Sequence, residues 1–124
     1  MVERFTREAK NLYPGRYKRQ ALRFARAEPE DTEALRRLAR ASEAHWGYDE
    51  AFMENFDAGF NVTEDFIRCN PVYAAGDCGC PAAFWGIRQD RDAWELEYFY
   101  VAEERLGRGL GKQMWEHMIG WCGK

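Results

Sequence analysis

The sequence lacks a continuous apolar run approaching the roughly 20 residues that a membrane-spanning helix needs. Its first residues also lack the order of charged, apolar and small residues that marks a secretory signal peptide. These two absences predict a cytoplasmic protein with no membrane partner. The chain has 124 residues and contains neither an internal repeat nor a low-complexity segment. We therefore expect a single domain.

Residues that bind metal ions are scarce. The chain has only two histidines, His45 and His117, and four cysteines. Cys78 and Cys80 are separated by one glycine, so they do not form the C-x₂-C pair of a zinc site. The sequence therefore predicts no metal site, and reduced thiols, as is usual in the cytosol.

The net charge of −3 argues against nucleic acid as a general partner. Residues 1–20 are an exception, because basic residues there outnumber acidic ones. A basic arm of this kind could contact an anionic surface, and a solvated tail is the alternative. We treat residues 1–20 as a basic N-terminal extension and residues 21–124 as the folded domain. The basic residues of the extension are Arg4, Arg7, Lys10, Arg16, Lys18 and Arg19.

Hydrophobic periodicity predicts an α+β fold. A strand at 22–27 is followed by helices at about 30–44 and 49–56, and by a short helical turn capped by Thr63. A hairpin over 72–88, a strand at 94–101 and a helix from Leu110 complete the order. This order is typical of a largely antiparallel, mixed sheet flanked by helices. The core is expected to include the helical stripe Leu110, Met114, Met118 and Trp121, together with Trp94 and Trp115.

Residues 101–112 carry the strongest functional signal. A strand ends, a turn with Gly107, Gly109 and Gly111 follows, and an amphipathic helix starts at once. Glycines let the backbone approach an anion closely and adopt positive φ. The first N–H groups of a helix have no partner within it, so they can bind phosphate oxygens. Positive charge from Arg105, Arg108 and Lys112 favours the same ligand.

Two common phosphate-binding motifs do not fit this loop. A P-loop requires G-x₄-G-K-S/T, whereas Leu106 stands in place of the first glycine and Gln113 follows Lys112. A dinucleotide fingerprint requires G-x-G-x-x-G in a parallel βαβ unit, whereas the spacing here is G-x-G-x-G after an antiparallel meander.

The loop instead resembles the signature of the GNAT superfamily of acetyl-CoA-dependent N-acetyltransferases, Gln/Arg-x-x-Gly-x-Gly/Ala. Gly109 and Gly111 match its two small residues, and the preceding strand ends in Tyr-Phe-Tyr-Val101. Leu106 departs from the first position, where the family contributes mainly a backbone amide. The resemblance covers residues from about 22 to 122. The alternative is a glycine-rich helix start without a ligand.

The resemblance implies acetyl-CoA as co-substrate and no metal. In the family, the strand before the loop pairs its backbone with the pantetheine arm, a role that falls here on Phe99, Tyr100 and Val101. The loop amides bind the pyrophosphate. They belong here to Leu106, Gly107, Arg108, Gly109, Leu110, Gly111 and Lys112.

The acceptor is expected to be a primary amine of a small molecule or peptide. Such an amine has a pKa of about 10 and must lose a proton before it attacks the thioester. Glu97, two residues from Glu95 on one strand face, is the candidate general base. A solvated sheet face is the alternative for both glutamates. His45, Trp46 and Tyr48 are candidate acceptor-binding residues because an aromatic cage can hold a cation, and turn or core roles are the alternative.

The resemblance also implies further strands and a helix after the glycine-loop helix, where this chain ends. Strand 94–101 is then left with an unpaired edge, which predicts a homodimer or a rearranged sheet. Two functions remain open. One is an active N-acetyltransferase, and the other is a catalytically impaired CoA-binding or interaction protein derived from the same fold.

Overall fold

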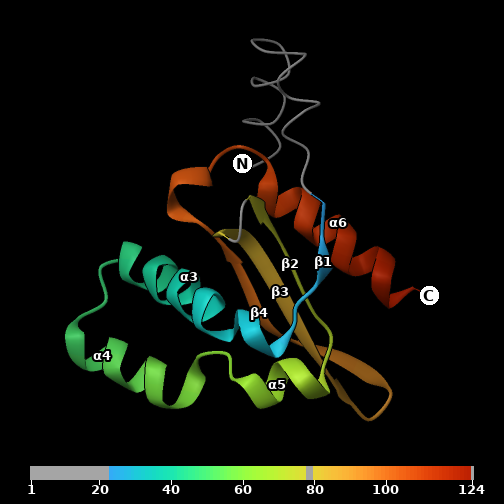
Figure 1. The fold of residues 1–124 in the computed structure, drawn as a ribbon, viewed down its shortest axis with the longest axis horizontal. Helices are drawn as coiled ribbons and strands as arrows, with labels where there is room; N and C mark the ends of the chain where they lie inside the picture. Colours follow the sequence, from blue (N-terminus) through green and yellow to red (C-terminus); the bar gives the residue numbers. More distant parts are fainter. Residues whose placement is uncertain (1–22, 78–79, 124) are drawn as a thin grey trace.

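The computed structural model describes residues 23–77 and 80–123, which form one antiparallel sheet with helices on both faces (Figure 1). The strand order is β1-β2-β3-β4, so each strand pairs with its neighbour in sequence. This confirms the predicted α+β class. The basic extension expected over residues 1–20 lies outside the described residues. The strands are β1 Ala25–Arg26, β2 Val72–Asp77, β3 Cys80–Asp90 and β4 Ala93–Val101.

Four helices and three shorter helical turns are interleaved with these strands in the described residues. The helices are α3 Thr32–His45, α4 Glu50–Asn55, α5 Glu64–Cys69 and α6 Leu110–Cys122. The turns are Pro29–Asp31 before α3, Phe56–Phe60 after α4 and Glu103–Arg105 after β4. Local capping explains two of the helix starts: the side chains of Asp49 and Thr63 accept hydrogen bonds from backbone N–H groups three residues later, at 2.8 and 3.0 Å.

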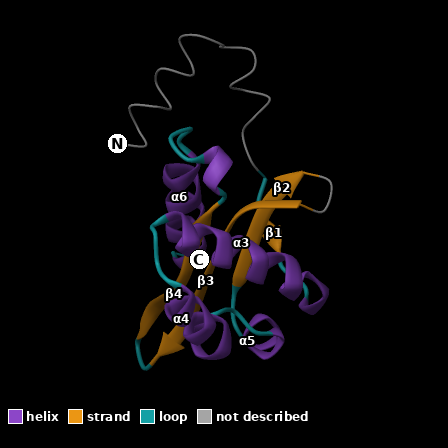
Figure 2. Cartoon of the chain, turned by 90° about the vertical axis from the view of Figure 1, so that its left-hand side faces the viewer, coloured by secondary structure: helices purple, strands orange, loops and turns teal. Residues whose placement is uncertain are grey.

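The sheet carries a separate apolar core on each face. Figure 2 shows the purple helices packed beside the orange strands of the sheet. Alternate residues of β3 point to opposite faces. Phe84 packs toward α3, α4 and α5, whereas Ala83, Trp85 and Ile87 pack toward α6. The predicted stripe of α6 meets the second core through Leu110, Met114 and Met118, all of which are buried.

Several sequence-based expectations need correction. The first strand is confined to Ala25–Arg26 rather than 22–27, and α4 continues as a π-helical turn to Phe60. Two tryptophans expected in the core are exposed, Trp94 by 39% and Trp115 by 50%. Trp85, which is fully buried on β3, takes the central core position instead.

A β-bulge interrupts the pairing of β3 with β4. Gly86 opposes Tyr98 and Ile87 opposes Leu96, so Glu97 is an extra residue in β4. Arg88, which opposes Glu95 directly, contacts both carboxylates: Nε donates to Glu97 at 2.9 Å, and Nη2 donates to Glu95. The two glutamates therefore share one guanidinium at an exposed position of the sheet.

Candidate functional site

A cavity of ≈560 Å³ lies between the C-terminal end of α3, the end of β4 and the start of α6. Figure 1 shows the loop from β4 to α6 at this end of the molecule. The walls combine apolar side chains with two cations. The lining residues are Ser42 from α3, Trp46 directly after it, Phe99 and Val101 from β4, Arg105, Leu106 and Gly107 from the loop, and Leu110, Gly111, Lys112 and Trp115 from α6.

The glycine loop turns the chain sharply from β4 into α6. Gly107 and Gly109 have φ values of 79° and 80°, a conformation that other residues rarely adopt. Gly109 is the N-cap of α6, and Gln113 N donates to its carbonyl at 3.1 Å. The amides of the first helical turn therefore belong to residues that line the cavity. A helix start of this kind favours an anionic ligand.

Charge at the cavity matches such an anion. Arg105 and Lys112 are among its lining residues, one from the loop and one from the first turn of α6. Arg108, between the two glycines with positive φ, is exposed and is not a lining residue. Arg105 and Lys112 therefore line the cavity, whereas Arg108, which lies between them in the sequence, does not.

One wall of the cavity is apolar. Phe99 and Val101 lie on the face of β4 that packs against α6. The rings of Phe99 and Trp115 meet edge to face with centroids 6.1 Å apart. An apolar wall beside a cationic helix start suits a ligand with an anionic group and a longer, less polar arm.

Residues 32–124 match the acetyltransferase (GNAT) family. The chain belongs to this family. The match includes α3, β4, the glycine loop and α6, so the cavity is formed by the GNAT part of the chain. Acetyl transfer is the reaction class of the family.

Solved structures show the same fold. The PaiA N-acetyltransferase from Thermoplasma acidophilum, in complex with coenzyme A, matches with a TM-score of 0.71 and 18% identity, over 82% of this chain and 71% of that one. The IAA acetyltransferase from Bacillus cereus ATCC 14579 matches with a TM-score of 0.52 and 20% identity, over 80% of this chain and 56% of that one. No curated protein matches the sequence.

Two residues that the GNAT resemblance assigns to the coenzyme also form contacts within the protein, and their roles stay predictions. The side chain of Tyr100 points away from the cavity toward α3, where its hydroxyl donates to Glu43 Oε1 at 2.8 Å. The backbone N–H of Leu106 donates to the Glu103 carbonyl at 3.1 Å, so this amide closes a local turn. Arg108 and Gly109 shape the loop without lining the cavity.

The three aromatic residues predicted to bind the acceptor do not converge on one point. Trp46 lines the cavity and is 68% exposed. His45 lies outside the cavity, with Nδ1 2.9 Å from Glu103 Oε1. Tyr48 stacks on Phe52, with ring centroids 4.1 Å apart. Of these three residues, only Trp46 is therefore placed to contact a ligand in the cavity.

Glu97 is also outside the cavity, exposed and held by Arg88. Its role as general base stays a prediction, and this placement does not favour it.

Sequence reasoning missed Ser42 and assigned Trp115 to the core. The sequence spacing could have identified Trp115 as a cavity residue. It follows Gly111 of the glycine loop by four positions, so the two residues lie on the same face of α6.

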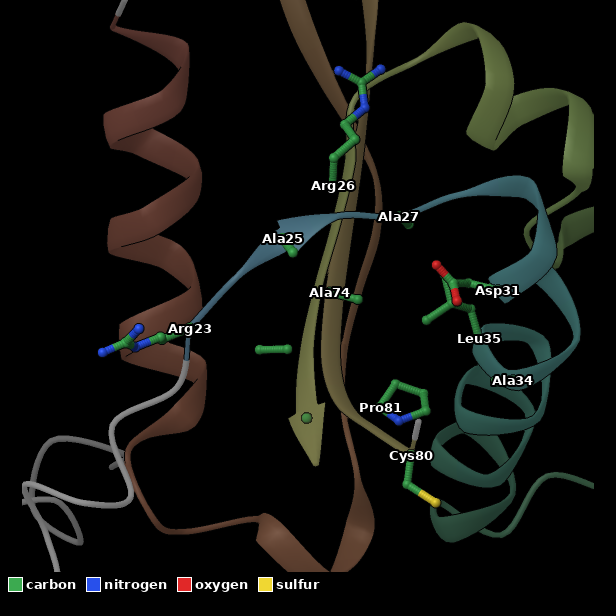
Figure 3. Close-up of a pocket in the computed structure, with 12 residues that line it drawn as sticks. Arg23, Ala25, Arg26, Ala27, Asp31, Ala34, Leu35, Ala74, Cys80 and Pro81 are labelled. Atoms are coloured by element: carbon green, nitrogen blue, oxygen red, sulfur yellow. The ribbon is translucent and has the colours of Figure 1, made fainter. Parts of the chain in front are cut away.

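A second cavity of ≈220 Å³ lies beside β1, the start of α3 and the adjoining ends of β2 and β3 (Figure 3). Alanine and leucine side chains form much of its wall. The Arg26 guanidinium is turned toward the end of α5, where Nη2 donates to the Asn70 carbonyl at 3.2 Å. Few polar groups are therefore directed at one point of this cavity.

Metal-ligating residues are dispersed in the described parts of the chain, and no group of three or more could hold an ion there. Cys69, Cys80 and Cys122 are free thiols. None of the helices that the structure describes has both the length and the apolar character of a membrane span.

Proposed function

We propose that this chain moves an acetyl group from acetyl-CoA to a primary amine of a small molecule or peptide. The observation that carries the proposal is the cavity in a GNAT-family chain, formed by the glycine turn, Arg105 and Lys112. The residues present fit the coenzyme. Two cations and the start of α6 suit the pyrophosphate, and Phe99 with Trp115 suits the pantetheine arm.

Strand β4 supplies a further reason for this fit. It is the last strand of the sheet in the described residues, and β3 pairs with only one of its edges. The N–H and C=O groups of the other edge are suited to an extended ligand with amide groups, which can pair as another strand would. The pantetheine arm of acetyl-CoA is such a ligand.

The proposed reaction is direct transfer. The protonated amine first gives one proton to a base, and its nitrogen lone pair then attacks the thioester carbonyl carbon. The carbon–sulfur bond breaks, and the thiolate leaves with the sulfur electron pair. The second nitrogen proton reaches this thiolate, which gives the amide and free coenzyme A.

The alternative is a GNAT chain that binds CoA without turnover. The position of Glu97 favours it, because this predicted base is paired with Arg88 away from the cavity. The chain also spans only 71% and 56% of the two similar solved chains.

We also propose that two copies of this chain form a homodimer. Trp94 is exposed at the start of β4, at the other end of the strand from the cavity-lining Phe99 and Val101, and an exposed strand edge there favours pairing with another chain. Sedimentation velocity at micromolar concentration tests this proposal. A single monomeric species with acetyl-CoA bound would contradict it.

Calorimetric titration of acetyl-CoA tests the binding step with a matched pair of variants. Lys112→Ala and Arg108→Ala each remove one cation from the loop region, but only Lys112 lines the cavity. A lost charge-assisted contact is worth about 1.5–3 kcal/mol, or roughly 10- to 150-fold in Kd. We expect a loss in this range for Lys112→Ala and less than about threefold for Arg108→Ala. Equal losses would show generic charge attraction, and no binding by wild type would remove the proposal.

Release of free thiol in the presence of a panel of primary amines tests the second step. Turnover with at least one amine supports the transferase. Tight binding of acetyl-CoA without turnover across the panel supports the impaired alternative instead.

A further inference from the structure

The lining of the cavity is poor in side chains that can accept a hydrogen bond or a proton. Among the described residues that form it, there is no aspartate, glutamate or histidine. Its polar side chains belong to Ser42, Arg105 and Lys112, and two tryptophans add indole N–H groups. Protonated lysine, arginine and the indole are hydrogen-bond donors only. The Ser42 hydroxyl is therefore the one side-chain acceptor in the described lining.

Ser42 and Trp46 form the α3 side of the cavity. Trp46 follows Ser42 by four positions, so the two side chains lie on the same face at the end of α3. Ser42 is half-buried, whereas the indole of Trp46 is exposed. The two cations of the lining lie instead on the loop and on α6, which packs against the opposite face of the sheet. In the proposed complex the pyrophosphate lies with these cations, so the α3 side is left for the acetyl group and the amine.

The carboxylates and the imidazole closest to this side in sequence lie outside the lining. Glu97 is held by a guanidinium, Nδ1 of His45 lies 2.9 Å from a glutamate oxygen, and Glu43 is bonded to a tyrosine hydroxyl. An aliphatic amine with a pKa of about 10 leaves only about one molecule in a thousand neutral at pH 7. Such an amine needs a base, and the lining that the structure describes contains none.

An amine bonded directly to an aromatic ring avoids this requirement. Its lone pair is delocalised into the ring, so the nitrogen is neutral at pH 7 and can attack without prior deprotonation. The flat ring can stack on the exposed indole of Trp46. The amine N–H groups are donors, and the hydroxyl of Ser42 is the side-chain acceptor available to them in the described part of the cavity.

We propose that the acceptor is a primary aromatic amine, neutral at pH 7, which stacks on Trp46 and donates a hydrogen bond to Ser42. This inference rests on the proposed acetyltransferase function and narrows its acceptor. The nitrogen lone pair attacks the thioester carbonyl carbon, the carbon–sulfur bond breaks, and the sulfur leaves with the electron pair. One of the two nitrogen protons passes to the sulfur, which gives the aryl amide and free coenzyme A.

Two isomeric amines test the substrate class with the wild-type protein. The isomers p-toluidine and benzylamine each carry one primary amine, but only benzylamine is largely protonated at pH 7. Without a base, benzylamine lacks a contribution of typically about 10²–10⁴-fold to rate. We expect kcat/KM, measured by thiol release, to be at least about tenfold higher for p-toluidine. An equal or higher value for benzylamine overturns the inference.

Ser42→Thr and Ser42→Val test the hydrogen bond to the amine. The two replacements have nearly the same shape and are both β-branched, but only threonine keeps the hydroxyl. Loss of a hydrogen bond between neutral groups corresponds to about 2- to 13-fold. We expect kcat/KM for p-toluidine to be lower by this factor in Ser42→Val than in Ser42→Thr, with the Kd for acetyl-CoA equal within about twofold. Equal kcat/KM values, or a matching loss of acetyl-CoA affinity in Ser42→Val, overturn the inference.

Trp46→Ala tests the stacking of the acceptor ring. A stacked aromatic pair contributes about 2- to 13-fold beyond the area that it buries. We expect KM for p-toluidine to rise by at least the lower of these factors, with kcat nearly unchanged. Phe60→Ala removes an exposed ring outside the cavity and should keep the wild-type KM. Equal KM values in the two variants overturn the inference.

The outcomes separate this inference from the proposed function. Turnover of benzylamine or another aliphatic amine without turnover of p-toluidine overturns the inference alone. Acetyl-CoA binding without thiol release for any amine of the panel overturns both. Preferred turnover of p-toluidine that is kept in Ser42→Thr and reduced in Ser42→Val supports both.

Discussion

The indole N–H of Trp85 donates to Nδ1 of His117 at 3.0 Å, which joins a fully buried position of β3 to the middle of α6. Phe24 stacks on the imidazole ring, with ring centroids 4.6 Å apart. Because α6 begins at the glycine loop, this contact helps to fix the helix whose first turn lines the cavity.

His117→Ala should destabilise the protein through this contact. Trp85 is fully buried, so loss of the acceptor leaves its N–H unsatisfied in the core, at a cost of about 1–3 kcal/mol. Urea unfolding followed by tryptophan fluorescence measures the change. Glu116→Ala, at the exposed neighbouring position, should stay within about 0.5 kcal/mol of wild type. Equal effects in the two variants would contradict the assignment.

Gly109→Ala should weaken both the fold and the binding of acetyl-CoA. The φ of 80° at this N-cap places an alanine in the left-handed region, which costs about 1–2 kcal/mol. Gly120→Ala is the matched control within α6, since an added Cβ there meets no atom within 4 Å. Alanine in a helix interior is favoured by about 1 kcal/mol over glycine. The two substitutions should therefore shift the urea midpoint in opposite directions.

Local patterns account for much of what the sequence predicted correctly. The Thr63 cap, the break after His45 and the buried stripe of α6 each depend on residues within a few positions of one another. The glycine loop is local in the same sense. The chemistry that such a short segment presents is set by the backbone conformations that its glycines permit.

Features that depend on distant residues escaped prediction. The hydrogen bond from Tyr100 to Glu43 joins a strand to a helix 57 positions earlier. The extra residue at Glu97 depends on the register with Gly86, and alternation along one strand does not reveal it. Trp115 is exposed because the elements around the cavity leave one of its faces uncovered, which no property of α6 alone indicates.

Gly86→Ala should destabilise the sheet at this bulge. A Cβ at Gly86 would lie 3.0 Å from Cδ2 of Tyr98, 3.2 Å from Phe66 and 3.3 Å from Val72. Overpacking of this kind costs typically about 1–3 kcal/mol. Gly59→Ala, where a Cβ meets nothing within 4 Å, is the control and should be close to neutral. Matching free energies of unfolding for wild type and Gly86→Ala would show that the rings can move aside.

Tyr100 should make the stability of the protein fall at alkaline pH. Burial, followed by the hydrogen bond and charge of Glu43, raises the pKa of this phenol above its ordinary value of about 10. The unfolded chain therefore releases the proton at lower pH than the folded chain does. The stabilisation is fully present below about pH 10 and is lost as the pH rises above it. Urea unfolding between pH 8 and 11 measures this loss.

Tyr100→Phe should be less stable than wild type at pH 8, because the bond to Glu43 is gone. A hydrogen bond to a charged group contributes about 1.5–3 kcal/mol, and half-burial of Glu43 favours the lower end. The difference should shrink above about pH 10, since phenylalanine has no proton to release. Tyr48→Phe removes an exposed phenol and should keep the wild-type pH dependence. A constant gap between Tyr100→Phe and wild type across the range would mean that Tyr100 ionises equally easily in both states.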